Sequence, residues 1–364
     1  MTPDLGNLFG GGASAPGATP RAKLAKSAPG GAGGGLGAGL GAGLGGDLLA
    51  AAGAALGLGQ ADPLTDALVS VQMQLAAAPM LSWCRLQFLP RSDFPALATG
   101  DPLTVSLSDA GAPVPVFAGT VAQLAWRDGR LDAMLSAPAA ALAKIRRNAG
   151  YENQSFSDLL NTFASDAGLS AGDIDAGPDY AFFAIDDRLS LWDWIARLAR
   201  HGDMPAWTDA QGRLNARPPR GQPVATFVYG QTLLSLEATA RDPATTAARI
   251  VGEGSAGRQG SDAWAWLAKD PQGVSAGGGL GAPVQNDGAL RSLSALAGAA
   301  AGSAAPADAV TITVPGTPAI DIASIFKLEK CPGGQGDGQW SAVDVRHRFS
   351  AGAGFTTQVV GISA

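Results

Sequence analysis

The chain has 364 residues, of which 46% are hydrophobic and 15% are charged, and its formal net charge is −6. No basic run is longer than Arg146-Arg147, so the composition gives no sign of the basic patch that a dedicated nucleic-acid-binding protein needs. Two histidines and two cysteines without paired Cys/His spacing also exclude a structural zinc site.

Residues 1–62 are rich in glycine and alanine and poor in aromatic side chains. The chain begins MTPDLGNLFG, without the basic stretch of a secretory signal. Residues 30–59 are nearly uncharged and carry small residues at the spacing of packed membrane helices. Their glycine density and Asp47 argue against a spanning helix. We predict a disordered, flexible arm, and two alternatives stay open: a membrane span, and an arm that folds on a partner.

Residues 63–147 are predicted to form a small antiparallel β domain. Hydrophobic and polar residues alternate in 69–75, in WCRLQFL (83–89) and in LTVSL (103–107). Asp128-Gly129 lies between two further strand-like stretches and is a strong two-residue hairpin turn. Cys84 shares an alternating face with its apolar neighbours and is predicted to be a buried free thiol.

Residues 148–220 are predicted to form a small α+β module. In NQSFSDLLNTFASDAGL (153–169), Ser155 is a candidate N-cap with Asp158 three residues later, and Gly168 ends the helix. A second helix is expected from near Ser190 to Gly202, after a strand at 180–185 and before a hairpin at 206–216.

The second helix carries Trp192 and Trp194. Such a pair is compatible with stacking on a carbohydrate. Aromatic residues at helical spacing more often belong to a hydrophobic core, and we favour that interpretation for both.

Residues 221–364 are predicted to form a second β domain. Strand-like stretches such as VATFVYG, AVTITVPG and SIFKLEK are interrupted by an Ala-rich segment, 289–301, that predicts a helix. No simple sequence repeat links the two β domains, but their sizes and textures match.

The closing stretch SAVDVRHRFSAGAGFTTQVV (341–360) predicts a β-hairpin that contains His347. A period of two places His347 on an apolar face and Asp344 on the opposite one. The apolar face comprises Val343, Val345, His347 and Phe349, and the other comprises Ala342, Asp344, Arg346 and Arg348. A general base needs a partner within hydrogen-bond reach on its own face, so we predict a structural histidine.

Taken together, the middle and C-terminal segments resemble the baseplate hub proteins of contractile tails, the phage late-control D and VgrG-type family. The first insert helix carries part of this resemblance, and LSLWDWIARLARHGDMPAWTDAQGRLNARP carries more through Trp192, Trp194 and Gly202. VPGTPAIDIASIFKLEK matches a Gly-x-Pro turn through Gly316 and Pro318. The closing hairpin matches through His347, Phe355 and Thr357. Together these motifs span about residues 68–362.

The resemblance implies two tube-type β-barrel domains, at about 63–147 and 221–364, flanking the α+β insert. It also implies a homotrimeric ring whose six barrels match a hexameric inner-tube or tube-initiator protein to a trimeric spike protein. VgrG-type chains continue into a needle, which is absent here, so the spike is expected to be a separate protein. The glycine-rich arm is not part of the family core, and residues 260–287 fit it poorly.

The leading hypothesis is a structural hub, assembled in the bacterial cytoplasm, with no catalytic residue, metal, cofactor or membrane anchor. A LysM-type baseplate protein, and a tape-measure protein or cargo in the lumen, are further candidate partners. The first alternative is a tail-tip peptidoglycan hydrolase, for which Asp186-Asp187 and Asp173/Asp175 are the visible acidic pairs. The second is a membrane-anchored assembly factor that uses residues 30–59.

Overall fold

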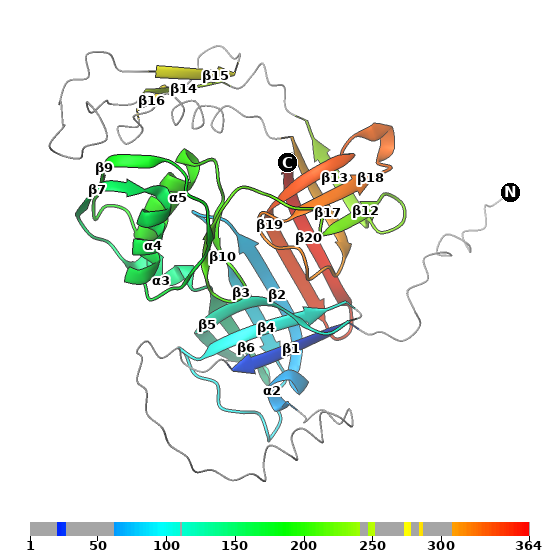
Figure 1. Ribbon diagram of the computed structural model, residues 1–364. Helices are drawn as coiled ribbons and strands as arrows, with labels where there is room; N and C mark the ends of the chain where they lie inside the picture. The colour runs from blue at the N-terminus through cyan, green and yellow to red at the C-terminus, as the bar shows by residue number, and fades with distance from the viewer. Residues whose placement is uncertain are drawn as a thin grey trace, which may run out of the picture.

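The structure, a computed structural model, describes residues 20–26, 62–109, 111–240, 247–251, 273–277, 284–286 and 308–363 (Figure 1). The apolar segment 30–59 and the Ala-rich segment 289–301 lie outside these residues. The fold is mainly β, with an α+β module between two β regions, which confirms the predicted fold class.

The first β region contributes six strands to a twelve-stranded sheet, in the order β1-β4-β5-β6-β3-β2. Its strands are β1 (Arg21–Lys26), β2 (Leu68–Ala76), β3 (Trp83–Phe88), β4 (Pro102–Ser108), β5 (Val114–Arg127) and β6 (Arg130–Ser136). All neighbours are antiparallel. Asp128 and Gly129 join β5 to β6 with φ angles of 50° and 75°. Two positive φ angles are what the tightest hairpin turn requires, so the hairpin prediction is confirmed.

The second β region contributes the other six strands, in the order β12-β18-β19-β20-β17-β13. They are β12 (Ala225–Val228), β13 (Ser235–Thr239), β17 (Ala309–Pro315), β18 (Ile325–Glu329), β19 (Gly338–Ser350) and β20 (Gly354–Ser363). β12 runs parallel to β18, and the other pairs are antiparallel.

The two β regions share one topology. Numbered along the chain within each region, the strands lie in the order first, fourth, fifth, sixth, third, second in both. β5 therefore corresponds to β19, β6 to β20, and β2 to β13. The first strand differs only in direction, since β1 is antiparallel to β4 whereas β12 is parallel to β18.

A β-bulge marks the same point in both regions. The register of β5 against β6 shifts just after Val121, and that of β19 against β20 shifts just after Ala342. At that point the Gly100 N–H donates to the Val121 carbonyl at 2.8 Å, and the Ala323 N–H donates to the Ala342 carbonyl at 2.9 Å. Gly100 and Ala323 both have positive φ, 93° and 61°. The two halves thus match in backbone detail as well as in strand order.

The two regions form one sheet because β2 pairs with β19. The pairing is antiparallel and runs from Ser70 opposite Ser350 to Ala76 opposite Asp344. β19 is 13 residues long, so its start pairs with β18 and its end is left for β2. One hydrophobic core crosses this joint, with Leu86, Val105 and Leu135 from the first region and Ile312, Phe326 and Val345 from the second.

The α+β module packs around a separate core. Its helices are α3 (Ala139–Lys144), α4 (Phe156–Asp166) and α5 (Leu191–His201). Its strands are β7 (Ala149–Ser155), β8 (Ala171–Ile174), β9 (Asp179–Ile185), β10 (Ala206–Thr208) and β11 (Leu214–Ala216). Ser155 with Asp158, and Ser190 with Asp193, form capping boxes at the starts of α4 and α5, so both helix predictions are confirmed.

Six residues of the predicted arm belong to the sheet. β1 pairs with β4 from Arg21 opposite Ser108 to Lys26 opposite Leu103. Leu24 is 1% exposed, and its N–H donates to Thr65 Oγ1 at 3.0 Å, beside helix α2 (Pro63–Asp66). The prediction that residues 1–62 lie outside the globular fold is therefore wrong for β1. A lone edge strand is held by backbone pairing and one buried leucine, which its composition does not reveal.

The bulge in β19 also corrects one predicted face. The period of two predicts Ala342 on the polar face and Val343 on the apolar one, but Ala342 is fully buried and Val343 is half-buried. The extra residue of a bulge shifts the alternation by one, so the faces before and after it are exchanged.

A separate three-stranded sheet is formed by strands that lie between β13 and β17 in chain order. It comprises β14 (Ala247–Val251), β15 (Gly273–Gly277) and β16 (Val284–Asn286), in the order β15-β14-β16. Part of it falls in residues 260–287, the segment that fits the family poorly.

Candidate functional site

The residues of the closing hairpin meet in one buried cluster. His347 is 0% exposed, and its Nδ1 lies 3.0 Å from Thr357 Oγ1, its partner across β19 and β20. The Thr317 N–H donates to the same hydroxyl at 2.9 Å. The rings of His347 and Phe355 lie 5.6 Å apart. The histidine therefore links two strands and a turn within the core.

His347 lacks the surroundings of a general base. Burial lowers its pKa to about 4. Asp344 lies on the other face, where its carboxylate accepts a hydrogen bond from Gln74 and pairs with Arg346 at 3.0 Å. A fully buried imidazole without a carboxylate partner is suited to packing and to holding Thr357.

Gly316 is needed where it stands. Its N–H donates to the Phe355 carbonyl at 2.9 Å, and a Cβ at this position would lie 1.9 Å from Phe355 Cδ1. Pro318, two residues later, is half-buried in the loop that leads toward β18. The structure thus brings His347, Gly316, Phe355 and Thr357 together.

The two tryptophans of α5 lie in the module core, as the helical spacing predicts. Trp192 is 2% exposed and donates through Nε1 to the Met80 carbonyl at 3.2 Å, so it ties the module to the first β region. Trp194 is 6% exposed and donates to the Asp186 carbonyl at 3.2 Å. Gly202 caps the helix through its N–H to the Leu198 carbonyl at 3.1 Å. Neither indole offers an open stacking face.

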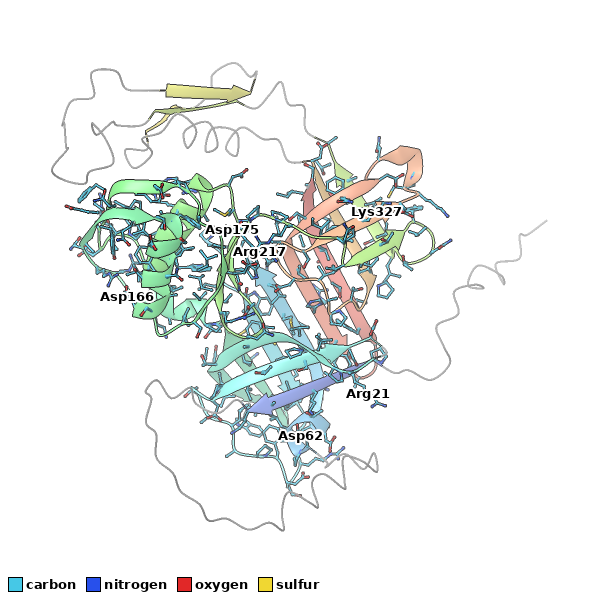
Figure 2. All side chains as sticks on the ribbon, in the orientation of Figure 1. Arg21, Asp62, Asp166, Asp175, Arg217 and Lys327 are labelled. Carbon is cyan, nitrogen blue, oxygen red and sulfur yellow. The ribbon has the colours of Figure 1, made fainter. Side chains whose placement is uncertain are left out.

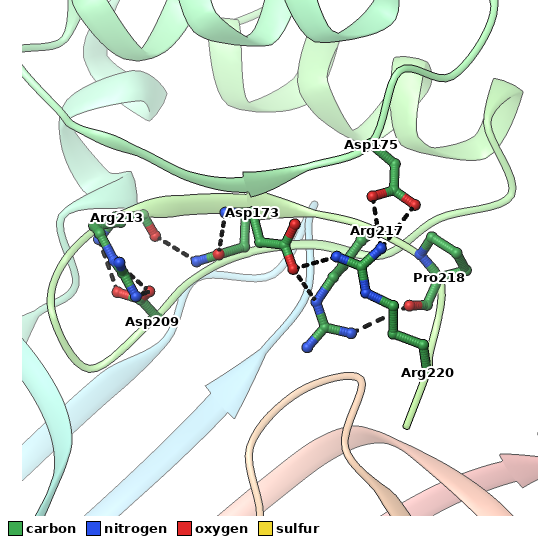
Figure 3. A network of polar contacts seen from close by, with 8 residues as sticks. Asp173, Asp175, Asp209, Arg213, Arg217, Pro218 and Arg220 are labelled. Atoms are coloured by element: carbon green, nitrogen blue, oxygen red, sulfur yellow. Dashed lines mark hydrogen bonds and ion pairs between the residues drawn. The ribbon is translucent and has the colours of Figure 1, made fainter. Parts of the chain in front are cut away.

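Arginines pair with three of the four carboxylates in the acidic pairs that a hydrolase would use. Asp173 pairs with Arg217 at 3.0 Å and with Arg220, and Arg220 reaches Asp175 at 3.0 Å (Figure 3). The hydrogen bond that Arg220 donates to Asp173 raises the pKa of Arg220. In the other pair, the hydrogen bond from Arg188 lowers the pKa of Asp186. Asp173, Asp175 and Asp186 are therefore engaged in ion pairs with arginines.

This arginine network lies where the module meets the sheet, as the positions of Asp175 and Arg217 show (Figure 2). The Arg217 guanidinium stacks over Trp207 at 5.4 Å, and Trp207 belongs to the core of the sheet although its strand, β10, is part of the module. Asp321 lies beside them, and desolvation raises its pKa to about 6. The network therefore stabilises the junction between the α+β module and the main sheet.

Two of the free strand edges form the candidate assembly site. β13 pairs with β17 on one side, and within the described ranges no strand pairs with its other side. β5 pairs with β6 up to Arg127, but β4 covers its other side only from Val114 to Thr120. The stretch Gln123–Arg127 thus also has an open edge in the part of the chain that the structure describes.

Exposed apolar side chains accompany both edges. Trp126, on the open end of β5, is 65% exposed, and Leu234, next to β13, is 60% exposed. The sequence predicted the β5–β6 hairpin but not these edges, because an edge is open or covered according to the length of a neighbouring strand. In the sequence, the signal available for a contact surface was Trp126, which stands two residues before the Asp128-Gly129 turn.

Two kinds of site are missing from the described residues. No group of three or more His, Cys, Asp or Glu side chains there could hold a metal ion. Within the same ranges, no helix has the length and hydrophobicity to cross a bilayer.

The fold is similar to that of two solved tail proteins. The 43 kDa tail protein of prophage MuSo2 from Shewanella oneidensis is similar over 81% of this chain and 94% of its own, with 12% identity and a TM-score of 0.59. The tail protein from Neisseria meningitidis MC58 is similar over 81% of this chain and 92% of its own, with 13% identity and a TM-score of 0.61. No protein-family model and no curated sequence matches the chain. At these identities the likeness establishes a shared fold.

Proposed function

We propose that this protein is the structural hub of the baseplate of a contractile injection machine: a phage tail, a tailocin, an extracellular injection system or a type VI apparatus. Three copies form a ring that adapts a hexameric inner-tube or tube-initiator protein to a trimeric spike. The hub assembles in the bacterial cytoplasm and becomes part of the particle.

The observation that carries this proposal is the duplicated six-stranded topology within one chain. Two matching units per chain give a threefold ring six similar units around its axis. Such a ring presents near-sixfold geometry to a hexameric neighbour and threefold geometry to a trimeric one, without a conformational switch. Open strand edges allow copies to add to one another without limit, and a closed ring stops this addition.

Two further observations support a structural role. His347 of the closing hairpin is buried in the core, and Asp173, Asp175 and Asp186 of the acidic pairs are bound to arginines. The fold shared with tail proteins of Shewanella oneidensis and Neisseria meningitidis is consistent with a place in a tail. A LysM-type baseplate protein, and a tape-measure protein or cargo in the lumen, remain proposed neighbours.

The test is the mass of the full chain co-expressed with its cognate spike protein, by native mass spectrometry. Three copies of this chain with three spike chains are expected. A stable one-to-one complex, or a ring of six copies, would refute the adaptor role.

A further inference from the structure

We propose that the open edge of β13 in one copy pairs with the open end of β5 in the next, repeating between chains the joint that β2 and β19 make within the chain. The proposal deepens the proposed function by naming the contact that would close its ring. Its partner is a second copy of this chain.

The internal duplication points to this contact. β13 occupies in the second region the place that β2 occupies in the first, and β5 occupies the place of β19. β2 and β19 pair with each other inside the chain. Their counterparts, β13 and β5, are the strands whose equivalent edges are open among the described residues. The β2–β19 contact is thus made within the chain, whereas the equivalent β13–β5 contact is available to a second chain.

The register of the proposed contact follows from the existing pairings. In the second region, a line of paired residues runs across the sheet from β13 to β19. It passes from Glu237 in β13 through Thr311 in β17 and Val360 in β20 to Asp344, the first residue after the β19 bulge. In the first region, the equivalent line ends at Gln123, the first residue after the β5 bulge. It starts at Gln72 in β2 and passes through Arg85 in β3 and Met134 in β6, so Gln72 corresponds to Glu237.

Gln72 stands opposite Arg348, four residues after Asp344. The equivalent position in β5, four residues after Gln123, is Arg127. The register therefore places Glu237 of one copy opposite Arg127 of the next. By the same step, Ala238 faces Trp126 and Thr239 faces Ala125.

The register follows from backbone pairings alone, and the side chains that it brings together are complementary. Glu237 and Arg127 are both exposed and carry opposite charges, and opposite charges facing each other across strands stabilise the pair. Trp126 meets a small partner in Ala238, which leaves room for an indole that is 65% exposed in the single chain. Its counterpart in the existing joint, His347, is 0% exposed. Formation of the second joint would bury Trp126 in the same way.

The two contacting surfaces are different, so the contact is heterologous and propagates from copy to copy until a ring closes. Each added copy pairs backbone groups that are otherwise left at a sheet edge.

The experiment is disulfide trapping in the full chain co-expressed with its cognate spike. One copy carries Ala125→Cys and a differently tagged copy carries Thr239→Cys. Cβ atoms of directly opposed residues are close enough for a disulfide. As the matched control, Gln74→Cys with Arg346→Cys in one chain tests the equivalent, existing pair. The native Cys84 and Cys331 are both buried free thiols, so the unmodified chain gives the background.

The expected product is a crosslink between the two tagged chains, with no crosslink between two copies of the same variant. Arg127→Glu should weaken assembly by about tenfold or more, and adding Glu237→Arg in the same chain should restore it. A threefold complex that gives no mixed crosslink, while the control pair oxidises, would overturn this contact and leave the proposed ring intact. A mixed crosslink within a complex of another copy number would retain the contact and refute the adaptor role. A hub that stays monomeric with its spike would refute both.

Discussion

The substitution His347→Gln is expected to change how the stability of this protein responds to acid. Burial gives His347 a folded-state pKa of about 4, against 6.5 for an ordinary histidine. The folded state therefore binds this proton less readily than the unfolded chain does. Acidification from pH 6.5 to 4 favours the unfolded chain, and the contribution of His347 to stability is fully present only above pH 6.5.

The magnitude follows from the two pKa values. Between pH 7 and pH 4.5, the unfavourable protonation of His347 should remove about 2 kcal/mol of folding free energy. Glutamine does not titrate and can still hydrogen-bond to Thr357, so the variant lacks this loss. The difference in unfolding free energy between the native chain and the variant should thus shift by about 2 kcal/mol over this interval, in favour of the variant at acid pH.

Asp321 is expected to change the acid dependence of stability in the opposite direction. Desolvation raises its folded-state pKa to about 6, against 3.8 for an ordinary aspartate. The folded state binds this proton more readily, so acidification from pH 6 to 4 favours folding, by about 1–2 kcal/mol. In the native chain the two effects oppose each other. Asp321→Asn should therefore make the protein more sensitive to acid, whereas His347→Gln makes it less sensitive.

The assay is thermal or chemical unfolding of each full-length variant at a series of pH values. His201→Gln is the matched control, because His201 is the other histidine and is half-buried at the end of α5. Parallel pH profiles for the native chain and His347→Gln would refute the argument that a buried neutral imidazole links the strands of the closing hairpin.

Two further substitutions test other parts of the fold. Gly316→Ala should cost about 1–3 kcal/mol, because its methyl group would overlap Phe355, and Phe355→Leu in the same chain should relieve part of this loss in a double-mutant cycle; additive losses would contradict the proposed overlap. Leu24→Ala should cost about 2–3 kcal/mol by chemical unfolding because Leu24 is the buried residue of β1, whereas Lys23→Ala at an exposed position should change little. Equal effects would show that β1 does not stabilise the sheet.

Local chemistry made much of this fold predictable from the sequence. A serine with an aspartate three residues later marks the start of each long helix of the module, since the two side chains satisfy the first N–H groups of that helix. Asp128-Gly129 predicts a turn because its backbone needs two positive φ angles. The alternation around His347 predicts burial beyond the bulge, since side chains of a strand point in turn to opposite faces.

The tertiary structure alone decided which strands meet. β1, with the sequence RAKLAK, is six residues long and stands within a glycine- and alanine-rich arm, yet it belongs to the sheet because β4 offers an edge and the core accepts Leu24. The bulge after Ala342 exchanged the faces of β19, although nothing in its residue types marks an inserted position. The joint between β2 and β19, the duplicated strand order and the open edges of β5 and β13 also come from pairings between distant segments. Backbone N–H and C=O groups make these pairings, and because every residue carries nearly the same backbone groups, side-chain patterns do not specify the partner strand.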